Sequence, residues 1–175
     1  MVDFEVVDIS HVDVDAPEVG DGAPDFTRPL VNDEYWQDTA LSELYNEGPV
    51  LLVFHPMDGA FPATYVWNEI RDRGWEGREA SYGDLQVIGV SVSSPYEHKT
   101  LIQERGIDSR LFSDPGAEVA EAYGIDWELD GMTGVREPLP AVFLVEEGTV
   151  RYAWVAEEWP DFPNYDEIEA AIDDL

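Results

Sequence analysis

Two continuous apolar runs in the first half of the chain predict buried strands. The longest run extends from Val50 to Phe54, and the predicted strand ends at His55. The second run extends from Leu85 to Val92. Apolar runs of about four to eight residues, bounded by turn residues, are typical of buried strands. We therefore expect both segments in the interior of one sheet.

A helix is predicted between these two strands. Apolar residues recur there at the spacing of one helix face, at Ala63, Val66, Trp67 and Ile70. Pro62 fits the first helical position, where its missing N–H does no harm. Gly74 is expected to end the helix. Arg71 and Arg73 lie just before it, where positive charges interact favourably with the helix dipole.

Capping residues mark two further helices after the second strand. Ser94, with Glu97 three residues later, forms a capping box for a helix that runs to about Arg105. A shorter helix opens at Asp114-Pro115 and ends at Gly124. The following stretch, residues 126–139, is predicted to be a loop.

A β-hairpin and a last helix are predicted at the C-terminal end. The hairpin pairs residues 141–146 with residues 150–155 around Gly148. Asn164 and Glu167 cap the last helix. Its inward-facing residues are expected to be Tyr165, Ile168, Ile172 and Leu175.

The order of these elements predicts an α/β protein with the thioredoxin layout, a central mixed sheet flanked by helices with a C-terminal hairpin and helix. The strands at residues 50–55 and 85–92 should be parallel neighbours, with the hairpin antiparallel beside them. Residues 22–175 suit one domain with one core. Residues 1–21 are acidic and are predicted to form either an arm or an edge strand.

Charge is the strongest signal in the composition. The chain has 39 Asp and Glu residues against 9 Lys and Arg, a net charge of -30, and Lys99 is its single lysine. The acidic residues are spread along the whole chain, which indicates a surface adapted to molar salt, where the Debye length is about 3 Å. This pattern favours a protein from the cytoplasm of a salt-accumulating halophile. The alternative is a mildly acidic protein from a mesophile. Nucleic acid is a poor partner for so acidic a chain.

The sequence lacks the features that several classes of protein function require. No apolar run approaches the roughly 20 residues that span a bilayer, and no signal-peptide pattern is present, so we expect no membrane contact and a cytoplasmic location. The three histidines, His11, His55 and His98, are too scattered to predict a metal site, and no cofactor motif is present. The chain has no cysteine, which excludes disulfides and thiol catalysis.

Five short segments resemble the peroxiredoxins, the alkyl hydroperoxide reductase and thiol-specific antioxidant (redoxin) family. The resemblance runs from about Gly22 to the C-terminus, and a cysteine-less member of haloarchaeal type fits the composition. The segments that carry it stand in family order: Ala23-Pro24-Asp25-Phe26, Leu41-Ser42-Glu43-Leu44, residues 90–95, Phe112-Ser113-Asp114-Pro115 and Ala122-Tyr123-Gly124-Ile125.

The resemblance implies a peroxidatic motif of proline, three residues, threonine, two residues and cysteine. Pro56 is present, but Ala60 stands at the threonine position and Ala63 at the cysteine position. Thr64 matches a threonine that commonly follows the cysteine. Pro140 stands where the family places an arginine. Loss of three groups together argues against a simple engineered Cys→Ala change, and it removes the nucleophile of cysteine peroxidase chemistry.

The same residues define an expected vestigial pocket formed by Pro56, Ala60, Ala63, Thr64 and Pro140. The resemblance to thioredoxins favours a cis peptide bond before Pro140, with a trans bond at the start of an edge strand as the alternative. His55 and Asp58 either line this pocket or make local structural hydrogen bonds. Amides near Ala63 and Thr64 need partners: water, the Thr64 hydroxyl, an anion or Asp58.

Three function classes remain after these steps. The first is a non-catalytic protein that keeps the fold for binding or assembly, and the second is a partner subunit of a cysteine-bearing relative. The third is an enzyme of another kind in the old pocket, for which the sequence offers no complete set of residues. A peroxidase of the redoxin family is the alternative that homology alone would assign. A homodimer is expected, formed through the edge strand at residues 150–155 or through the face around the active-site loop.

Overall fold

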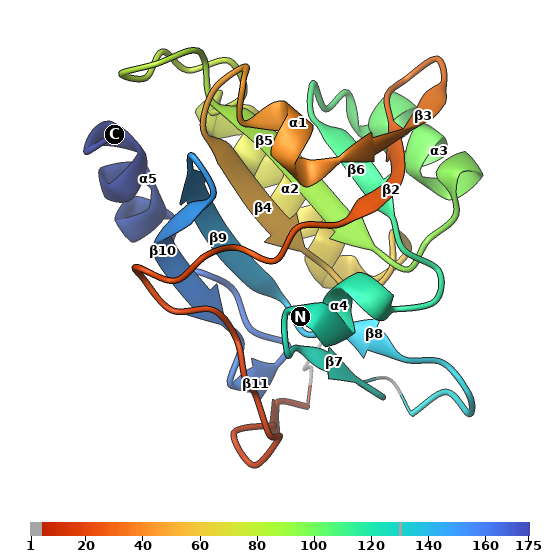
Figure 1. Ribbon diagram of the computed structural model, residues 1–175. Helices are drawn as coiled ribbons and strands as arrows, with labels where there is room; N and C mark the ends of the chain where they lie inside the picture. Colours follow the sequence, from red (N-terminus) through yellow and green to blue (C-terminus); the bar gives the residue numbers. More distant parts are fainter. Residues whose placement is uncertain (1–4, 130) are drawn as a thin grey trace.

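The fold is built on one seven-stranded mixed sheet with the strand order β10-β9-β4-β5-β6-β2-β3 (Figure 1). The computed structural model describes residues 5–129 and 131–175. The three central strands are parallel, and they are β4 (Val50–Phe54), β5 (Gln86–Ser91) and β6 (Arg110–Ser113). The predicted parallel pairing of the first two strands is confirmed, with Leu52 opposite Ile88.

Antiparallel strands complete the sheet on both sides. The predicted hairpin is confirmed as β9 (Ala141–Glu146) and β10 (Thr149–Val155), and β9 pairs with β4 so that Phe143 lies opposite Leu52. On the other side, β2 (Thr27–Val31) pairs with β6 and with β3 (Trp36–Ala40). The strands β10 and β3 are therefore the two edges of the sheet.

The strands β2, β3 and β6 were not among the predicted elements. Pro29 interrupts the pattern of β2, and β3 has exposed polar residues, so neither segment has the apolar run of a central strand. In the sheet, β2 and β3 are the last two strands beside β6, where partly exposed strands are tolerated. The four residues of β6 are too few to show a period.

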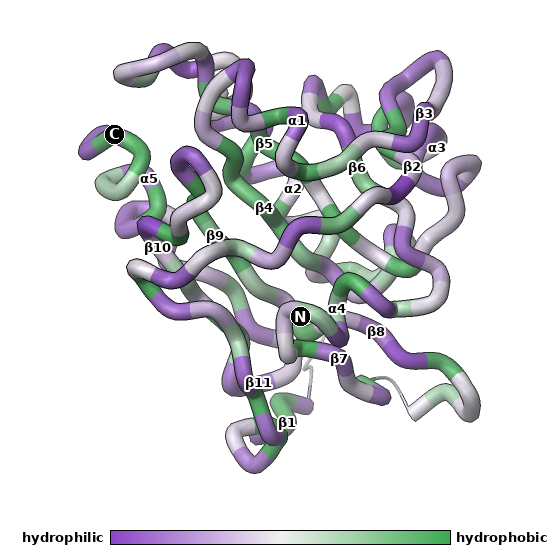
Figure 2. The backbone as a smooth tube through the Cα atoms, viewed as in Figure 1, coloured by the Kyte–Doolittle hydropathy of each residue, from purple (hydrophilic) through white to green (hydrophobic). Residues whose placement is uncertain are grey.

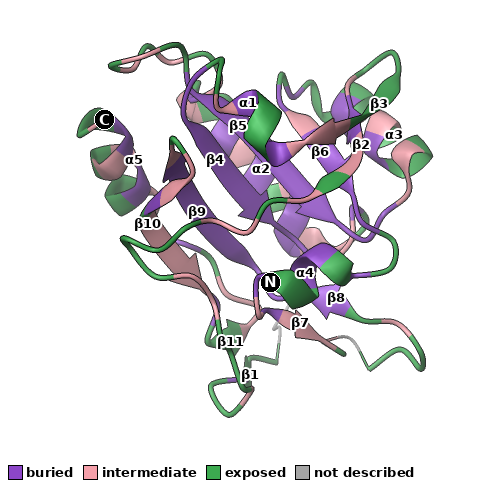
Figure 3. Ribbon diagram, viewed as in Figure 1, coloured by how far each residue is buried: buried purple, intermediate pink, exposed green. Residues whose placement is uncertain are grey.

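Helices cover both faces of this sheet. On one face lie α2 (Phe61–Arg73), α3 (Pro95–Arg105) and α5 (Tyr165–Asp173), and on the other lie the shorter α1 (Leu41–Leu44) and α4 (Glu118–Ala122). Successive residues of β4 point to opposite faces, so Leu51 packs in one cluster and Leu52 in the other. Figures 2 and 3 show the result, a hydrophobic and buried centre of the sheet beneath more polar, exposed helices and loops.

The helix ends follow the predicted caps. Ser94 Oγ accepts a hydrogen bond from the Glu97 N–H at 3.3 Å, and Asn164 Oδ1 accepts one from the Glu167 N–H at 3.2 Å. Gly74 ends α2 in the left-handed region with φ 65°. The helix α2 begins at Phe61, one residue earlier than predicted, so Pro62 occupies its second position.

One glycine permits the close packing of α2 on the sheet. A Cβ atom at Gly89 of β5 would lie 2.6 Å from the Trp67 ring and 2.7 Å from Leu111. Trp67 itself is fully buried. The missing side chain at this position therefore lets the Trp67 ring lie directly against the central strands, which places its indole N–H beside the carboxyl end of β4.

Short strand pairs lie outside the main sheet. The predicted loop at residues 126–139 contains one such pair, β7 (Asp126–Trp127) with β8 (Glu137–Pro138). Near the N-terminus, β1 (Val7–Asp8) pairs with β11 (Glu158–Trp159), and the Asp15 N–H donates to the Gly124 carbonyl at 3.1 Å. The domain boundary at residue 21 stays a prediction. Among the described residues, no helix combines the length and apolarity that crossing a membrane requires.

Candidate functional site

The candidate site lies at the carboxyl end of β4, where the chain turns into α2. His55 follows the strand directly, and the loop from Pro56 to Ala60 leads to the first turn of the helix. The Ala60 carbonyl accepts hydrogen bonds from the Ala63 N–H at 3.1 Å and the Thr64 N–H at 3.4 Å. Two amides that were expected to need outside partners are thus satisfied by the main chain. The Ala63 side chain is fully buried.

Asp58 is the centre of a buried hydrogen-bond network beside this turn. His55 Nε2 lies 2.7 Å from Asp58 Oδ1, and His98 Nδ1 lies 2.7 Å from Asp58 Oδ2. The Ser91 hydroxyl donates to Oδ1 at 3.2 Å, and the Asp58 N–H donates to Ser93 Oγ at 3.0 Å. The Asp58 side chain is 7% exposed, and the two histidine rings are buried. The network therefore joins the loop, the end of β5 and α3.

The partners of His55 fix its protonation. The Trp67 indole N–H donates to His55 Nδ1 at 3.1 Å. An indole nitrogen is a donor only, so Nδ1 must accept and the ring proton lies on Nε2. His55 is therefore a neutral imidazole that donates its single N–H to Asp58.

His98 has a different protonation because both of its partners are acceptors. His98 Nε2 lies 2.9 Å from the Phe112 carbonyl oxygen, and Nδ1 faces the Asp58 carboxylate. With Asp58 ionised, both ring nitrogens of His98 must donate, which makes this ring a cation. Burial opposes the ionisation of Asp58, but the hydrogen bonds from His55 and His98 outweigh it and hold the pKa of Asp58 below its ordinary value.

This arrangement restricts the chemistry that the network can perform. Each ring nitrogen of His55 and His98 already has a protein partner. Neither ring keeps a free lone pair that could take a proton from a substrate or bind a metal ion. Within residues 5–129 and 131–175, no group of three metal-ligating side chains is assembled. The network holds the loop and α3 together rather than forming an acid–base pair.

Pro140 lies at the same end of the sheet, but the expectation of a cis peptide bond before it is wrong. In the described part of the chain the single cis bond is Trp159–Pro160, so the Leu139–Pro140 bond is trans. Ala141 pairs with Phe54, which places Pro140 one register step further along, beside His55. The Ala156 N–H donates to the Pro140 carbonyl at 2.9 Å, so the chain continues extended into β9.

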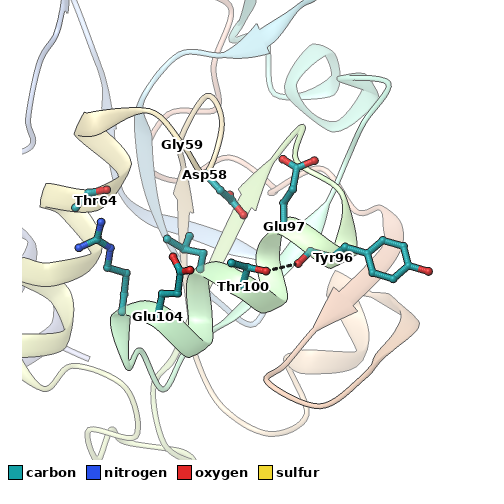
Figure 4. A pocket seen from close by; sticks show the side chains of 9 residues that line it. Asp58, Gly59, Thr64, Tyr96, Glu97, Thr100 and Glu104 are labelled. Carbon is teal, nitrogen blue, oxygen red and sulfur yellow. Dashed lines mark hydrogen bonds between the residues drawn. The ribbon is translucent and has the colours of Figure 1, made fainter.

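Two segments of the chain hold the residues of the predicted vestigial pocket. Pro56, Ala60, Ala63 and Thr64 lie in the loop and the first turn of α2, and Pro140 lies just before β9, in register with His55. That these residues form one pocket stays a prediction. Asp58 and Thr64 also line a cavity of about 480 Å³ on the side of α3 (Figure 4). His55 is turned away from that cavity into the network with Trp67.

The roles of Ser91, Ser93 and His98 were missed in the sequence. One signal was available: neighbouring parallel strands bring their carboxyl ends together, so residues that follow the strands at 50–55 and 85–92 had to meet. His98 lies on the helix directly after the second strand. Its pairing with Asp58 depends on the direction of both side chains, which spacing does not reveal.

The fold and the loop geometry define a thioredoxin-fold protein of peroxiredoxin type. The family model described as AhpC/TSA matches residues 19–153, and the chain belongs to this family. It is 31% identical over 145 residues to a chloroplastic 2-cysteine peroxiredoxin of Chattonella marina var. antiqua, covering 78% of this chain and 70% of the relative. It is 32% identical to a putative peroxiredoxin of Synechocystis, covering 78% of this chain and 68% of the relative.

Solved structures agree with the fold assignment. The peroxidoxin BcpB of Mycobacterium tuberculosis superposes with a TM-score of 0.74 at 23% identity, over 90% of this chain and 97% of that one. The 2-Cys peroxiredoxin of Plasmodium vivax superposes with a TM-score of 0.72 at 23% identity, over 89% of this chain and 94% of that one. At such identities these structures establish the fold alone.

Proposed function

We propose that this chain is a non-catalytic member of the peroxiredoxin family, which keeps the fold for binding or assembly and has lost peroxidase chemistry. The observation that carries the proposal is Ala63, which lies fully buried in the first turn of α2 in a chain without cysteine. Ala60 and Pro140 offer no hydroxyl or guanidinium to a peroxide. The histidines of the network are engaged with protein partners, so they supply no replacement nucleophile or base.

The protein should consume no hydrogen peroxide above a heat-treated control, with any thiol reductant. Without a thiolate, the site has no nucleophile that attacks the peroxide oxygen and is then regenerated by a thiol reductant. The measurement is peroxide loss by pure, metal-free protein in high salt. Turnover in proportion to protein concentration would instead support the alternative, an antioxidant peroxidase of the redoxin family.

The proposed setting is the cytoplasm of a halophile. A net charge of -30 repels itself at low salt and is screened at high salt. The melting temperature should therefore fall as salt is lowered from molar to about 0.1 M, where the Debye length grows from about 3 Å to about 10 Å. Differential scanning calorimetry across that range measures the effect. An unchanged melting temperature would show that the acidic composition is no adaptation to salt.

The proposed assembly is a homodimer or a complex with a cysteine-bearing relative. The position of β10 at an edge of the sheet supports edge-to-edge pairing, since an edge strand presents main-chain groups to a neighbour. Residues near Gly20 and Gly22 bond to the first residues of β10 and leave the later ones to a partner. Copurification from the native host at high salt separates the two cases, because a heteromer brings a stoichiometric second chain.

A further inference from the structure

The cavity between the start of α2 and α3 carries charged groups that the peroxidase motif does not involve (Figure 4). Its volume is about 480 Å³, which lies within the range of roughly 300–1,000 Å³ that is usual for small-molecule sites. Asp58 and Thr64 line it from the loop and α2, and Glu97, Glu104 and Arg105 line it from α3. In Figure 4 the Asp58 carboxylate points toward α3.

Arg105 is an unpaired cation in a chain where cations are scarce. Within the described residues, Lys99 and Arg105 are the basic side chains without an ion pair, whereas every other one has a carboxylate within 4.0 Å. The Thr64 hydroxyl also lines the cavity and makes no hydrogen bond to a described residue. A free guanidinium and a free hydroxyl on one cavity are suited to a carboxylate.

The remaining charged groups of the cavity are suited to cations. Glu97 accepts a hydrogen bond from the Ser94 hydroxyl at 3.1 Å, and neither Glu97 nor Glu104 has an ion pair within the described part of the chain. Asp58 Oδ2 accepts one described hydrogen bond, from His98, and a carboxylate oxygen can accept two. A buried acceptor and two carboxylates without an ion pair to a described residue thus belong to residues that line the same cavity as Arg105.

We propose that this cavity binds a small molecule with two cationic groups and one carboxylate, as in a free basic amino acid. Two glutamates and one guanidinium match those charges, because the Asp58 charge is balanced by His98. The carboxylate lies against Arg105 and Thr64, and the ammonium groups lie against Asp58, Glu97 and Glu104. The inference names a ligand for the proposed binding role, and its failure leaves the loss of peroxidase chemistry untouched.

Isothermal titration calorimetry tests the proposal with L-lysine and three analogues, in salt at which circular dichroism shows folded protein. L-lysine should bind with a dissociation constant of about 1 mM or below. Cadaverine lacks the carboxylate, norleucine lacks the side-chain ammonium, and Nα-acetyl-lysine lacks the charged α-amine. Each should bind about 10-fold more weakly, since each loses one charge-assisted hydrogen-bond group.

Two variants locate the carboxylate end of the ligand. Arg105→Gln should weaken L-lysine about 10-fold and leave cadaverine unchanged or tighter, because cadaverine has no group to meet the guanidinium. Lys99→Gln is the matched control, with the same charge change on the same helix outside the cavity. Thr64→Val keeps every charge and should weaken L-lysine about threefold with no effect on cadaverine.

Three results would overturn the proposal. The first is no heat of binding with L-lysine at millimolar concentration. The second is equal affinity for L-lysine and cadaverine. The third is an equal loss of L-lysine binding in Arg105→Gln and Lys99→Gln, which would assign the attraction to overall charge rather than to this cavity.

Discussion

Replacing Asp58 by asparagine should lower the free energy of unfolding by about 3 kcal/mol or more, the usual cost of removing one partner of a buried ion pair. The change leaves the His98 ring without its counter-charge, and it places an amide where two ring N–H groups and a hydroxyl all donate. Urea denaturation followed by tryptophan fluorescence measures the loss. Trp67 lies in the same network and is one of the six tryptophans that contribute to the signal.

Asp38→Asn is the matched control, since Asp38 is exposed on the edge strand β3 and the charge change is the same. It should alter stability by less than about 0.5 kcal/mol. Equal losses in the two variants would mean that the Asp58 network contributes nothing beyond overall charge.

The difference between wild type and Asp58→Asn should depend on pH with a definite sign. The pKa of Asp58 is lowered in the folded protein, so its contribution is present above the unfolded-state pKa of about 3.9. It is lost as the pH falls through the lower, folded-state pKa. The gap between the two unfolding curves should therefore narrow as the pH falls below about pH 4, where Asp58 starts to be protonated in the unfolded chain. A gap that widens below about pH 4 would contradict the assigned ionisation of Asp58.

The central strands and the main helices could be predicted because local sequence signals mark each of them. The strand at Val50–Phe54 is apolar at every position, and the N-cap residues Ser94 and Asn164 mark where α3 and α5 begin. The strand β2 and the edge strand β3 were missed because partly exposed strands need no apolar period. Their place depends on the hydrogen bonds of β6 to Leu30 and Val31, which are contacts over long sequence distances.

The sequence predicted where the loop and the helix of the candidate site begin, but it did not predict the hydrogen bonds between the side chains there. The positions of Ala60, Ala63 and Thr64 at the start of α2 follow from the motif and the predicted helix start. The cis bond at Pro140 was inferred from a resemblance rather than from residues, and the hydrogen bond from Ala156 accompanies an extended, trans chain instead. The Asp58–His98 pair joins residues 40 positions apart, and only the three-dimensional arrangement brings them together.

Restoring cysteine at position 63 tests what the site has lost. The Ala63 side chain is fully buried, and burial raises the pKa of a thiol because it disfavours the charged form. Pro140 provides no cation to oppose that effect. Ala63→Cys alone should therefore yield a thiol that reacts with peroxide no faster than an ordinary surface cysteine. Ala170→Cys, at an exposed position of α5, supplies that reference rate.

The triple variant Ala63→Cys, Ala60→Thr, Pro140→Arg should react with hydrogen peroxide at least about 100-fold faster than Ala63→Cys, the size of effect seen when oriented donors to a developing charge are added or removed. The threonine hydroxyl would orient the peroxide, and the guanidinium would favour the thiolate and the developing charge on oxygen. Stopped-flow measurement of sulfenic acid formation in high salt gives the rates, and circular dichroism checks that each variant is folded. Equal rates in the single and triple variants would show that residues 60 and 140 do not occupy the positions assigned to them, since cysteine alone would then suffice.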